Sequence, residues 1–259
     1  MFVDLNADVG ESFGAWTLEH DEALFPFLSS TKLACGFHAG DPVTMHATLK
    51  LARQFNMGVG ALPSFPDRVG FRPRIPEASS EEVYADVLYH VCALAASVGV
   101  PLRQVKAHGA LSICAWTHAP TAQAIAQAVY GVHPTLPLLV LPTTLLETEA
   151  RKLSLPVVLE LFPERAYLHD GHLAPRSLPG SSIHNPHEAA CRAVTMVKEG
   201  QIQTLDGGFS EFKADTFCVH GDTPNAVEIA CAIRAALEAE GIEIRAVAVP
   251  TLRRPEVPA

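Results

Sequence analysis

The stretch MFVDLNADVGE at residues 1–11 alternates apolar and polar residues, which is typical of a β-strand with two different faces. We predict a strand over Phe2–Asn6. Side chains two residues apart on a strand point the same way, so Asp4, Asn6 and Asp8 share one face if the strand stays extended through them. This first strand would then end in a group of polar side chains.

Short apolar segments of this kind recur along the chain and alternate with longer helical segments. Further strands are predicted at Lys32–Ala34, Met57–Ala61, Gln104–Lys106, Leu138–Leu141, Val157–Leu161, Thr216–Val219 and Glu243–Val249. Helices are predicted near Glu19–Leu28, Pro42–Phe55, Ser80–Val98, Pro120–Tyr130, Thr144–Leu153, Pro186–Lys198 and Pro224–Glu240. This repetition in one chain predicts an α/β fold: a closed or nearly closed parallel β/α barrel formed by a single domain, residues 1–259. The alternative is an open doubly wound sheet.

Several helix starts are marked by a capping side chain. Asp41, Asn185 and Thr223 each precede a proline at the first predicted helical position. Ser79 and Glu82 have the spacing of a capping box. Asp41 is therefore expected to cap a helix and not to take part in catalysis.

The composition limits the classes of partner. Of the 259 residues 48% are hydrophobic and 18% charged, and the net charge is -9, with no block of like charge. An acidic surface argues against nucleic acid and anionic membranes as partners, and neither a signal peptide nor a membrane span is expected. The six cysteines contain no C-x-x-C pair, so we expect reduced, mostly buried thiols and a cytoplasmic protein.

Other polar side chains also follow predicted strands. Lys106 and His108 share a face at one strand end, His220 and Asp222 at another, and His38 follows a third. In a parallel barrel all such ends meet at one rim, where barrel enzymes place their sites. The rim would offer acid–base groups and side chains able to bind a metal. Against this, a single histidine is more often structural, and Asp222 could simply cap a helix.

The two long loops, Leu62–Pro76 and Phe162–Ile183, are either active-site covers or plain surface excursions. Glu160 ends the apolar strand PVVLELF and could face the rim, while Arg165, Tyr167 and Arg176 belong to the second loop. Arginines there could bind a substrate carboxylate in a bidentate fork. For Arg165 a surface ion pair is an equal alternative.

The motifs of other chemistries are missing. The chain has no G-x-x-x-x-G-K-[ST] phosphate loop, no G-x-G-x-x-G fingerprint after a strand, no G-x-S-x-G nucleophile elbow and no H-E-x-x-H. The sequence therefore offers no nucleotide-binding loop of its own.

Five stretches carry a resemblance to a known family. They are DLNADVGESFGAW at 4–16, ACGFHAGDP at 34–42, KAHGAL at 106–111, ELFPERAYLHDGHLAPRS at 160–177 and DTFCVHGDTP at 215–224. In this order they resemble the lactam-utilisation family, understood as the A component of prokaryotic 5-oxoprolinase. The resemblance spans nearly the whole chain, and several of its motifs are long and unusual.

The resemblance implies a seven-stranded parallel β/α barrel similar to polysaccharide deacetylases. It also implies cleavage of 5-oxo-L-proline, or a related lactam, to L-glutamate, coupled to ATP hydrolysis in a complex with 5-oxoprolinase subunits B and C. A five-membered lactam closes readily, so opening it needs an energetic push, and activation of the amide oxygen by phosphate would supply one. ATP would thus act through the complex.

Carried over by motif, the resemblance implies a set of site residues. We assign Asp8, Lys106 and His108 to catalysis, with Asp8 or His108 as general base for water and Lys106 stabilising the oxyanion. Arg176 would hold the substrate carboxylate. The remaining substrate-binding candidates are Asp4, Asn6, His38, Glu160, His220 and Asp222. No metal ligand is assigned, and the use of a divalent metal is left open.

The chain departs from the family pattern in two stretches, and four of the changed positions are of particular interest for the site. It reads GALPSFPD at 60–67 where the family usually reads GAHPGYPD, and KAHGALSI at 106–113 where the family usually reads KPHGALYN. The changed positions include Leu62, Ser64, Ser112 and Ile113. Two alternatives follow: a stand-alone metal-dependent deacetylase or amidase, and a divergent barrel that only binds partners or ligand.

Overall fold

Seven parallel strands close into a barrel in the computed structural model, which describes residues 1–18, 21–69, 74–98, 102–221, 223 and 225–247. The barrel strands are β1 (Phe2–Val9), β2 (Ser30–Ala34), β3 (Gly58–Leu62), β4 (Gln104–Lys106), β5 (Leu138–Val140), β6 (Val157–Leu161) and β9 (Thr216–Val219). Each pairs with the next, and β9 returns to β1 with Asp4 opposite Thr216. This last pairing confirms the closed barrel and excludes the open sheet.

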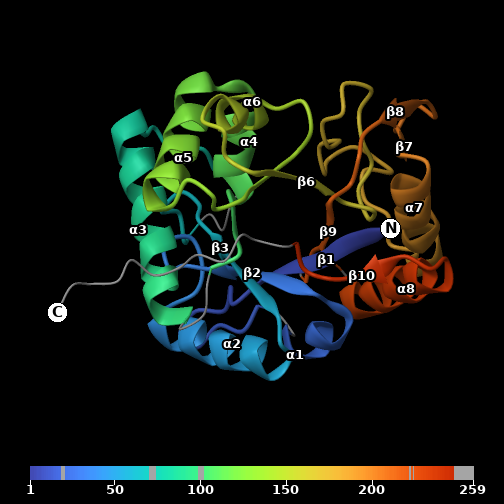
Figure 1. The fold of residues 1–259 in the computed structure, drawn as a ribbon, viewed down its shortest axis with the longest axis horizontal. Coiled ribbons are helices and arrows are strands. Elements are labelled where there is room, and N and C mark those ends of the chain that lie inside the picture. The colour runs from blue at the N-terminus through green and yellow to red at the C-terminus, as the bar shows by residue number, and fades with distance from the viewer. Residues whose placement is uncertain (19–20, 70–73, 99–101, 222, 224, 248–259) are drawn as a thin grey trace.

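Helices surround the barrel on all sides (Figure 1). They are α1 (Asp21–Leu24), α2 (Pro42–Gln54), α3 (Ser80–Val98), α4 (Gly109–Thr117), α5 (Ala119–Val132), α6 (Leu145–Lys152), α7 (Pro186–Lys198) and α8 (Ala226–Ala239). A short strand, β10 (Glu243–Ile244), extends the sheet beside the start of β1. None of these described helices is both long and apolar enough to cross a membrane.

The predicted strands β4, β6 and β9 have the expected bounds, and β1 runs three residues further, to Val9. Strand β2 begins two residues earlier than predicted, β3 is shifted by one residue, and β5 and β10 end earlier. Three larger differences remain. The first helix is short and continues as a 3₁₀ turn, Phe25–Phe27, because Pro26 removes a backbone donor. Helix α4 was not predicted, and neither was the antiparallel pair β7 (Gln201–Gln203) and β8 (Phe209–Glu211), which lies outside the barrel.

The predicted helix caps are present where the structure describes them. Asp41 accepts hydrogen bonds from the amides of Val43 and Thr44, both at 2.8 Å. Asn185 caps α7 in the same way, and Ser79 and Glu82 form the reciprocal capping box. The expected cap at Thr223 involves Pro224, which lies outside the described residues.

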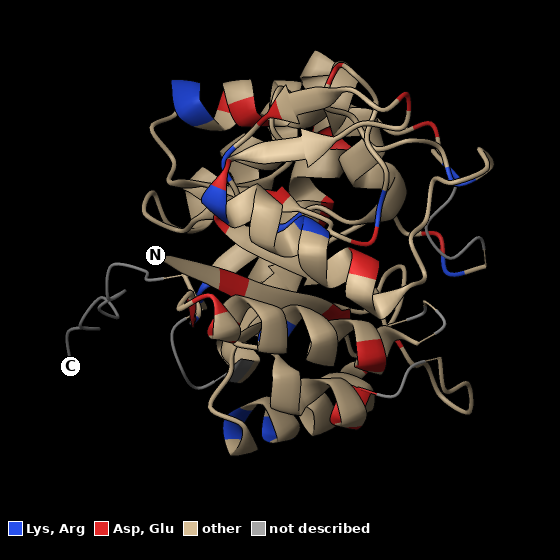
Figure 2. Cartoon of the chain, turned by 90° about the vertical axis from the view of Figure 1, so that its right-hand side faces the viewer, with Lys and Arg blue, Asp and Glu red and all other residues tan. Residues whose placement is uncertain are grey.

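The two faces of the barrel wall differ in chemistry. Outward-facing Val3, Leu5, Ala7 and Val9 of β1 pack with the helices into the main apolar core. The alternate residues Asp4, Asn6 and Asp8 are also fully or nearly fully buried, but they face the barrel interior. Figure 2 shows acidic residues along the strand that begins at the N-terminus. The interior is therefore polar, unlike the branched apolar filling usual in β/α barrels.

All six cysteines are free thiols, but the expectation that most are buried is wrong. Only Cys35 and Cys218 are buried; Cys92, Cys191 and Cys231 are exposed. The exposed three lie on helices α3, α7 and α8, whose outer faces meet solvent.

Candidate active site

A pocket of about 590 Å³ opens at the carboxyl ends of the barrel strands. Its polar lining includes Asp8, Lys106, His108, Glu160 and His220, each from or just after a barrel strand. Its apolar wall is formed by Ile113, Trp116, Leu141, Phe162 and Leu173. The volume lies within the range of small-molecule sites, and the mixture of a few polar groups with an apolar wall is typical of them.

Lys106 is the centre of the polar lining. Its ammonium group donates to both carboxylate oxygens of Asp8, at 3.0 and 3.1 Å, and lies 3.1 Å from Glu160 Oε2. Burial alone would lower the pKa of Lys106, but Asp8, the Cys218 sulfur and Glu160 outweigh it and raise the pKa well above its usual value. Lys106 is therefore a fixed cation at the floor of the pocket.

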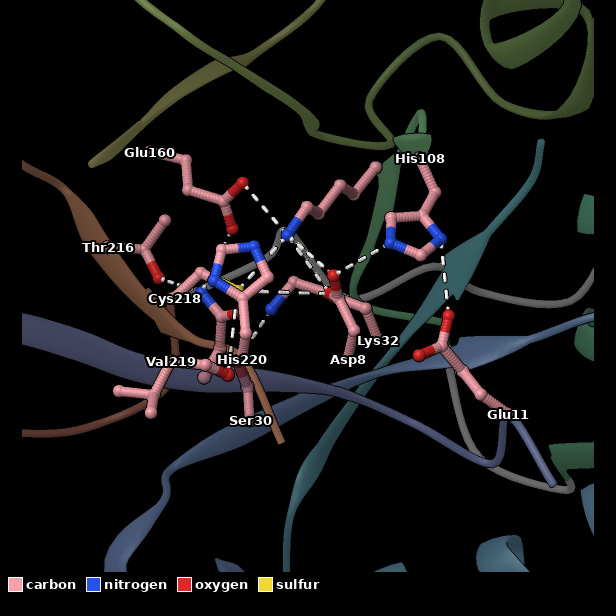
Figure 3. Close-up of polar contacts among 12 residues, drawn as sticks. Asp8, Glu11, Ser30, Lys32, His108, Glu160, Thr216, Cys218, Val219 and His220 are labelled. Carbon is pink, nitrogen blue, oxygen red and sulfur yellow. Dashed lines mark hydrogen bonds and ion pairs between the residues drawn. The ribbon is translucent and has the colours of Figure 1, made fainter. Parts of the chain in front are cut away.

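Asp8 is the matching fixed anion. Burial would raise the pKa of its carboxyl, but Lys106, His220 and Lys32 together lower it below its ordinary value. His108 Nε2 lies 3.3 Å from Asp8 Oδ2 (Figure 3). The pocket thus holds an ionised carboxylate between an ammonium group and an imidazole, both close enough to interact with it directly.

A second polar layer lies beneath the pocket, inside the barrel. Asp4 accepts hydrogen bonds from Ser29, Ser30 and Thr216 at 2.7–2.8 Å. Asn6 donates to Glu160 Oε1 at 3.2 Å. Neither Asp4 nor Asn6 lines the pocket. The prediction from strand alternation gave the correct face for both, but they lie below the surface that a ligand reaches.

Lys32 and Cys218 also lie in this polar layer, and neither was predicted as a site residue. Lys32 donates to Ser30 at 3.1 Å, and burial lowers its pKa despite opposition from Asp4 and Glu160. A side chain at Gly60 would meet Lys32 and Gln104, so this glycine gives the lysine its space. Burial and the nearby Asp8 raise the pKa of Cys218 well above its usual value, so its thiol is not a ready nucleophile.

His38 lies beside the pocket and not in it. Its Nε2 is 3.0 Å from His108 Nδ1, and Glu11 Oε1 lies 3.3 Å from that same His108 nitrogen. Gly10, with a φ of +70°, ends the alternation of β1 and turns the chain toward Glu11. Gly40 is needed opposite it, because a Cβ there would lie 2.7 Å from the Gly10 carbonyl oxygen. Glu11 was missed because strand alternation does not continue past such a glycine.

His220 is held by a residue that the sequence did not single out. Its Nδ1 makes a short contact with Glu164 Oε1, and its ring stacks on Phe162 with centroids 5.2 Å apart. Glu164 is buried at the start of the second long loop. This pairing fixes the imidazole at the pocket wall.

The second long loop forms one side of the pocket. Arg165 donates to the carbonyls of Ala174 and Ser181, so it holds the loop closed on itself. Its side chain is buried, so it does not lie at the surface as the alternative above required. Arg176 lines the pocket, where its guanidinium group could meet a ligand. Asp222 lies outside the described residues.

Four of the positions that depart from the family pattern fall into three places. Ser112 and Ile113 line the pocket. Ser64 donates to the carbonyl of His108 at 2.8 Å, and the neighbouring Pro63 carbonyl accepts from the His108 amide. Leu62 ends β3, one residue beyond the predicted end at Ala61, and it is fully buried and does not line the pocket. The changes therefore affect the wall of the pocket and the main chain that carries His108.

Comparison with known proteins gives a consistent result. The chain is 56% identical over 249 residues to the A component of 5-oxoprolinase from Thermus thermophilus, covering 95% of this chain and 100% of that protein. It is 49% identical over 247 residues to the corresponding component from Deinococcus radiodurans, covering 93% and 95%.

Solved structures confirm the fold. The lactam utilization protein from Thermus thermophilus superposes with a TM-score of 0.92 at 55% identity, over 95% of this chain and 100% of that one. The Xyl-CE4 domain of a xylanase from the hindgut metagenome of Trinervitermes trinervoides shares the fold alone, with a TM-score of 0.50 at 10% identity over 93% and 86% of the chains. Residues 3–251 match the LamB/YcsF family, and the chain belongs to that family.

Proposed function

We propose that this chain is the lactam-opening subunit of an ATP-dependent 5-oxoprolinase, which converts 5-oxo-L-proline to L-glutamate. The observation that carries the proposal is the 56% identity, over the full length of the relative, to a 5-oxoprolinase component. The pocket supports it, because a fixed cation and a fixed carboxylate lie side by side where a small amide could bind.

The proposed chemistry is hydrolysis of the ring amide. Asp8, or His108 acting beside it, takes a proton from water, and the hydroxide adds to the ring carbonyl carbon. Lys106 stabilises the negative charge that develops on the carbonyl oxygen. The carbon–nitrogen bond then breaks, and the proton taken from water passes to the nitrogen, which becomes the free amine of glutamate. Because the carbonyl oxygen of the activated substrate carries the phosphoryl group from ATP, ring opening leaves an acyl phosphate, and a second water releases inorganic phosphate from it.

The remaining candidates bind and position. Arg176 holds the substrate carboxylate, Glu160 accepts from the ring N–H, and His220 contacts the substrate from the opposite wall. In the layer below, Asn6 donates to Glu160 and to Thr216, and Thr216 donates to Asp4. His38 positions His108. Asp222 stays a binding candidate on its motif alone.

ATP enters through the complex. The chain carries no nucleotide loop motif, so we propose that subunits B and C supply ATP binding and that the activated substrate is hydrolysed in this pocket. Free thiols on the exposed helix faces fit a reducing compartment, and we propose a cytoplasmic location.

Reconstitution tests the proposal. The purified chain should release negligible glutamate from 5-oxoproline and ATP, and activity should appear when subunits B and C are added. A panel of lactams of different ring size, given to the same complex, would show whether Ser112 and Ile113 have changed the substrate. Robust lactam opening by the chain alone, or none by the complex on any lactam, would contradict the proposal.

A further inference from the structure

Three buried side chains beside the pocket direct ligand atoms at one another. His38 Nε2 and His108 Nδ1 are 3.0 Å apart, and Glu11 Oε1 lies 3.7 Å from the first and 3.3 Å from the second. The three side chains are between 1% and 5% exposed. Figure 3 shows His108 between Glu11 on one side and Asp8 on the other.

The separations match those around a tetrahedral metal ion. A zinc ion binds histidine nitrogen and carboxylate oxygen at about 2.0–2.2 Å, which places neighbouring ligand atoms roughly 3.3–3.6 Å apart. The three separations, 3.0, 3.3 and 3.7 Å, lie within a few tenths of an ångström of this range. Two imidazoles and one carboxylate also form a known protein ligand set for zinc, with the fourth position open.

The surroundings of His108 fit the same interpretation. A metal-binding histidine usually donates its other ring nitrogen to a carboxylate, which fixes the ring and its tautomer. Here the second nitrogen, Nε2, lies 3.3 Å from Asp8 Oδ2. On its other side the Asp8 carboxylate contacts the Lys106 ammonium group, 3.0 Å from Oδ1, so it is held in place between the ammonium group and the imidazole.

We propose that Glu11, His38 and His108 bind one divalent ion of the zinc class. The ion would hold His108 with its Nε2 proton directed at Asp8, so that Asp8 and not His108 is left as the acceptor for the proton of water. This goes beyond the lactam chemistry proposed above, and it is tested by binding, so its outcome does not depend on whether the complex opens a lactam.

The test uses the full chain without a histidine tag, stripped of metal by a chelator and dialysed. Titration with zinc, followed by calorimetry and elemental analysis, should show one ion per chain and a raised unfolding temperature. Cobalt should bind in its place with the visible spectrum of a tetrahedral site. His38→Gln and Glu11→Gln should each weaken binding by more than about 100-fold, beyond the range found for residues that only support a ligand.

Asp8→Asn should weaken binding less, by about 10–100-fold, because Asp8 touches a ligand and not the ion. His46→Gln is the matched control: His46 lies on the solvent-facing side of α2, away from the three ligands, and should not affect binding. Circular dichroism of each metal-free variant checks that it is folded. The proposal is overturned if the folded wild-type chain binds no stoichiometric ion, or if the His38 and Glu11 variants bind as tightly as the His46 variant.

Discussion

Replacing Lys106 with methionine removes the cation at the floor of the pocket while keeping a side chain of similar length. Asp8 and Glu160 both lie 3.0–3.1 Å from the ammonium group, so the substitution removes the cation that each of them contacts directly. At an effective dielectric constant of about 20, each contact corresponds to about 5 kcal/mol of attraction before desolvation is subtracted. Since the lysine itself is costly to bury, we expect a net loss of about 3–5 kcal/mol in the free energy of unfolding.

Urea denaturation at pH 7 measures this loss, with Lys152→Met as the control. Lys152 also pairs with a glutamate, at 2.7 Å, but its side chain is 63% exposed, so its removal should change stability by less than about 0.5 kcal/mol. Adding Asp8→Asn to Lys106→Met should restore part of the loss, because one of the two uncompensated charges is gone. A cost below about 1 kcal/mol for Lys106→Met would refute the idea that the barrel interior depends on this cation.

Four further outcomes follow from the structure. The pKa of Asp8 is lower in the folded chain than its ordinary value of 3.8, so its ionised form stabilises the fold above pH 3.8, and this stabilisation is lost as the pH falls through the folded pKa. Asp8→Asn should therefore flatten the acid side of a profile of stability against pH measured by urea denaturation. An unchanged profile would contradict this. In the reconstituted complex, Arg176→Ala should raise the KM for the lactam by roughly 10–100-fold with little change in kcat. The control is Arg151→Ala, on the exposed face of α6, which should change neither KM nor kcat. Alkylation of the native chain, followed by mass spectrometry, should label the exposed Cys92, Cys191 and Cys231 first. Cys218 and Cys35 should react later, because burial raises the pKa of both thiols, that of Cys35 to about 12. Early labelling of Cys218 would count against its buried position. Leu62→Ala should cost about 2–5 kcal/mol in urea denaturation because Leu62 is fully buried, and a cost near zero would argue that its side chain reaches solvent.

Much of the barrel could be predicted because its signals are local. The strands β4, β6 and β9 are short apolar segments next to polar ends, and the caps at Asp41 and Asn185 are read from neighbouring residues. Helix α4 could not be found in this way. Its N-cap residue, His108, makes no side-chain capping hydrogen bond, and the helix is apolar around most of its circumference, so neither a start signal nor a clear period marks it.

The candidate site, like the fold, could be predicted only in part. Strand parity correctly grouped Asp8 with Asp4 and Asn6, and the rule that parallel strand ends meet brought Asp8 together with Lys106 and His108. Parity does not give depth, so Asp4 and Asn6 were expected at a surface that they do not reach. Glu11 follows a glycine with a left-handed backbone, and Glu164 lies in a turn of the second long loop. The direction of each side chain depends on tertiary packing, which a short sequence pattern does not encode.

The polar barrel interior has a consequence for how the chain folds during synthesis. The hydrogen bond from Thr216 to Asp4 joins residues 212 positions apart, and Lys106 needs partners from β1 and β6. Until β9 has left the ribosome, an incomplete barrel would have to bury Asp4 without Thr216, and Asn6 without one of its two acceptors. Unpaired buried polar groups are costly, so half-built forms have little to stabilise them. The apolar outer layer can collapse early, but we expect the wall to close in one late step that waits for nearly the whole chain.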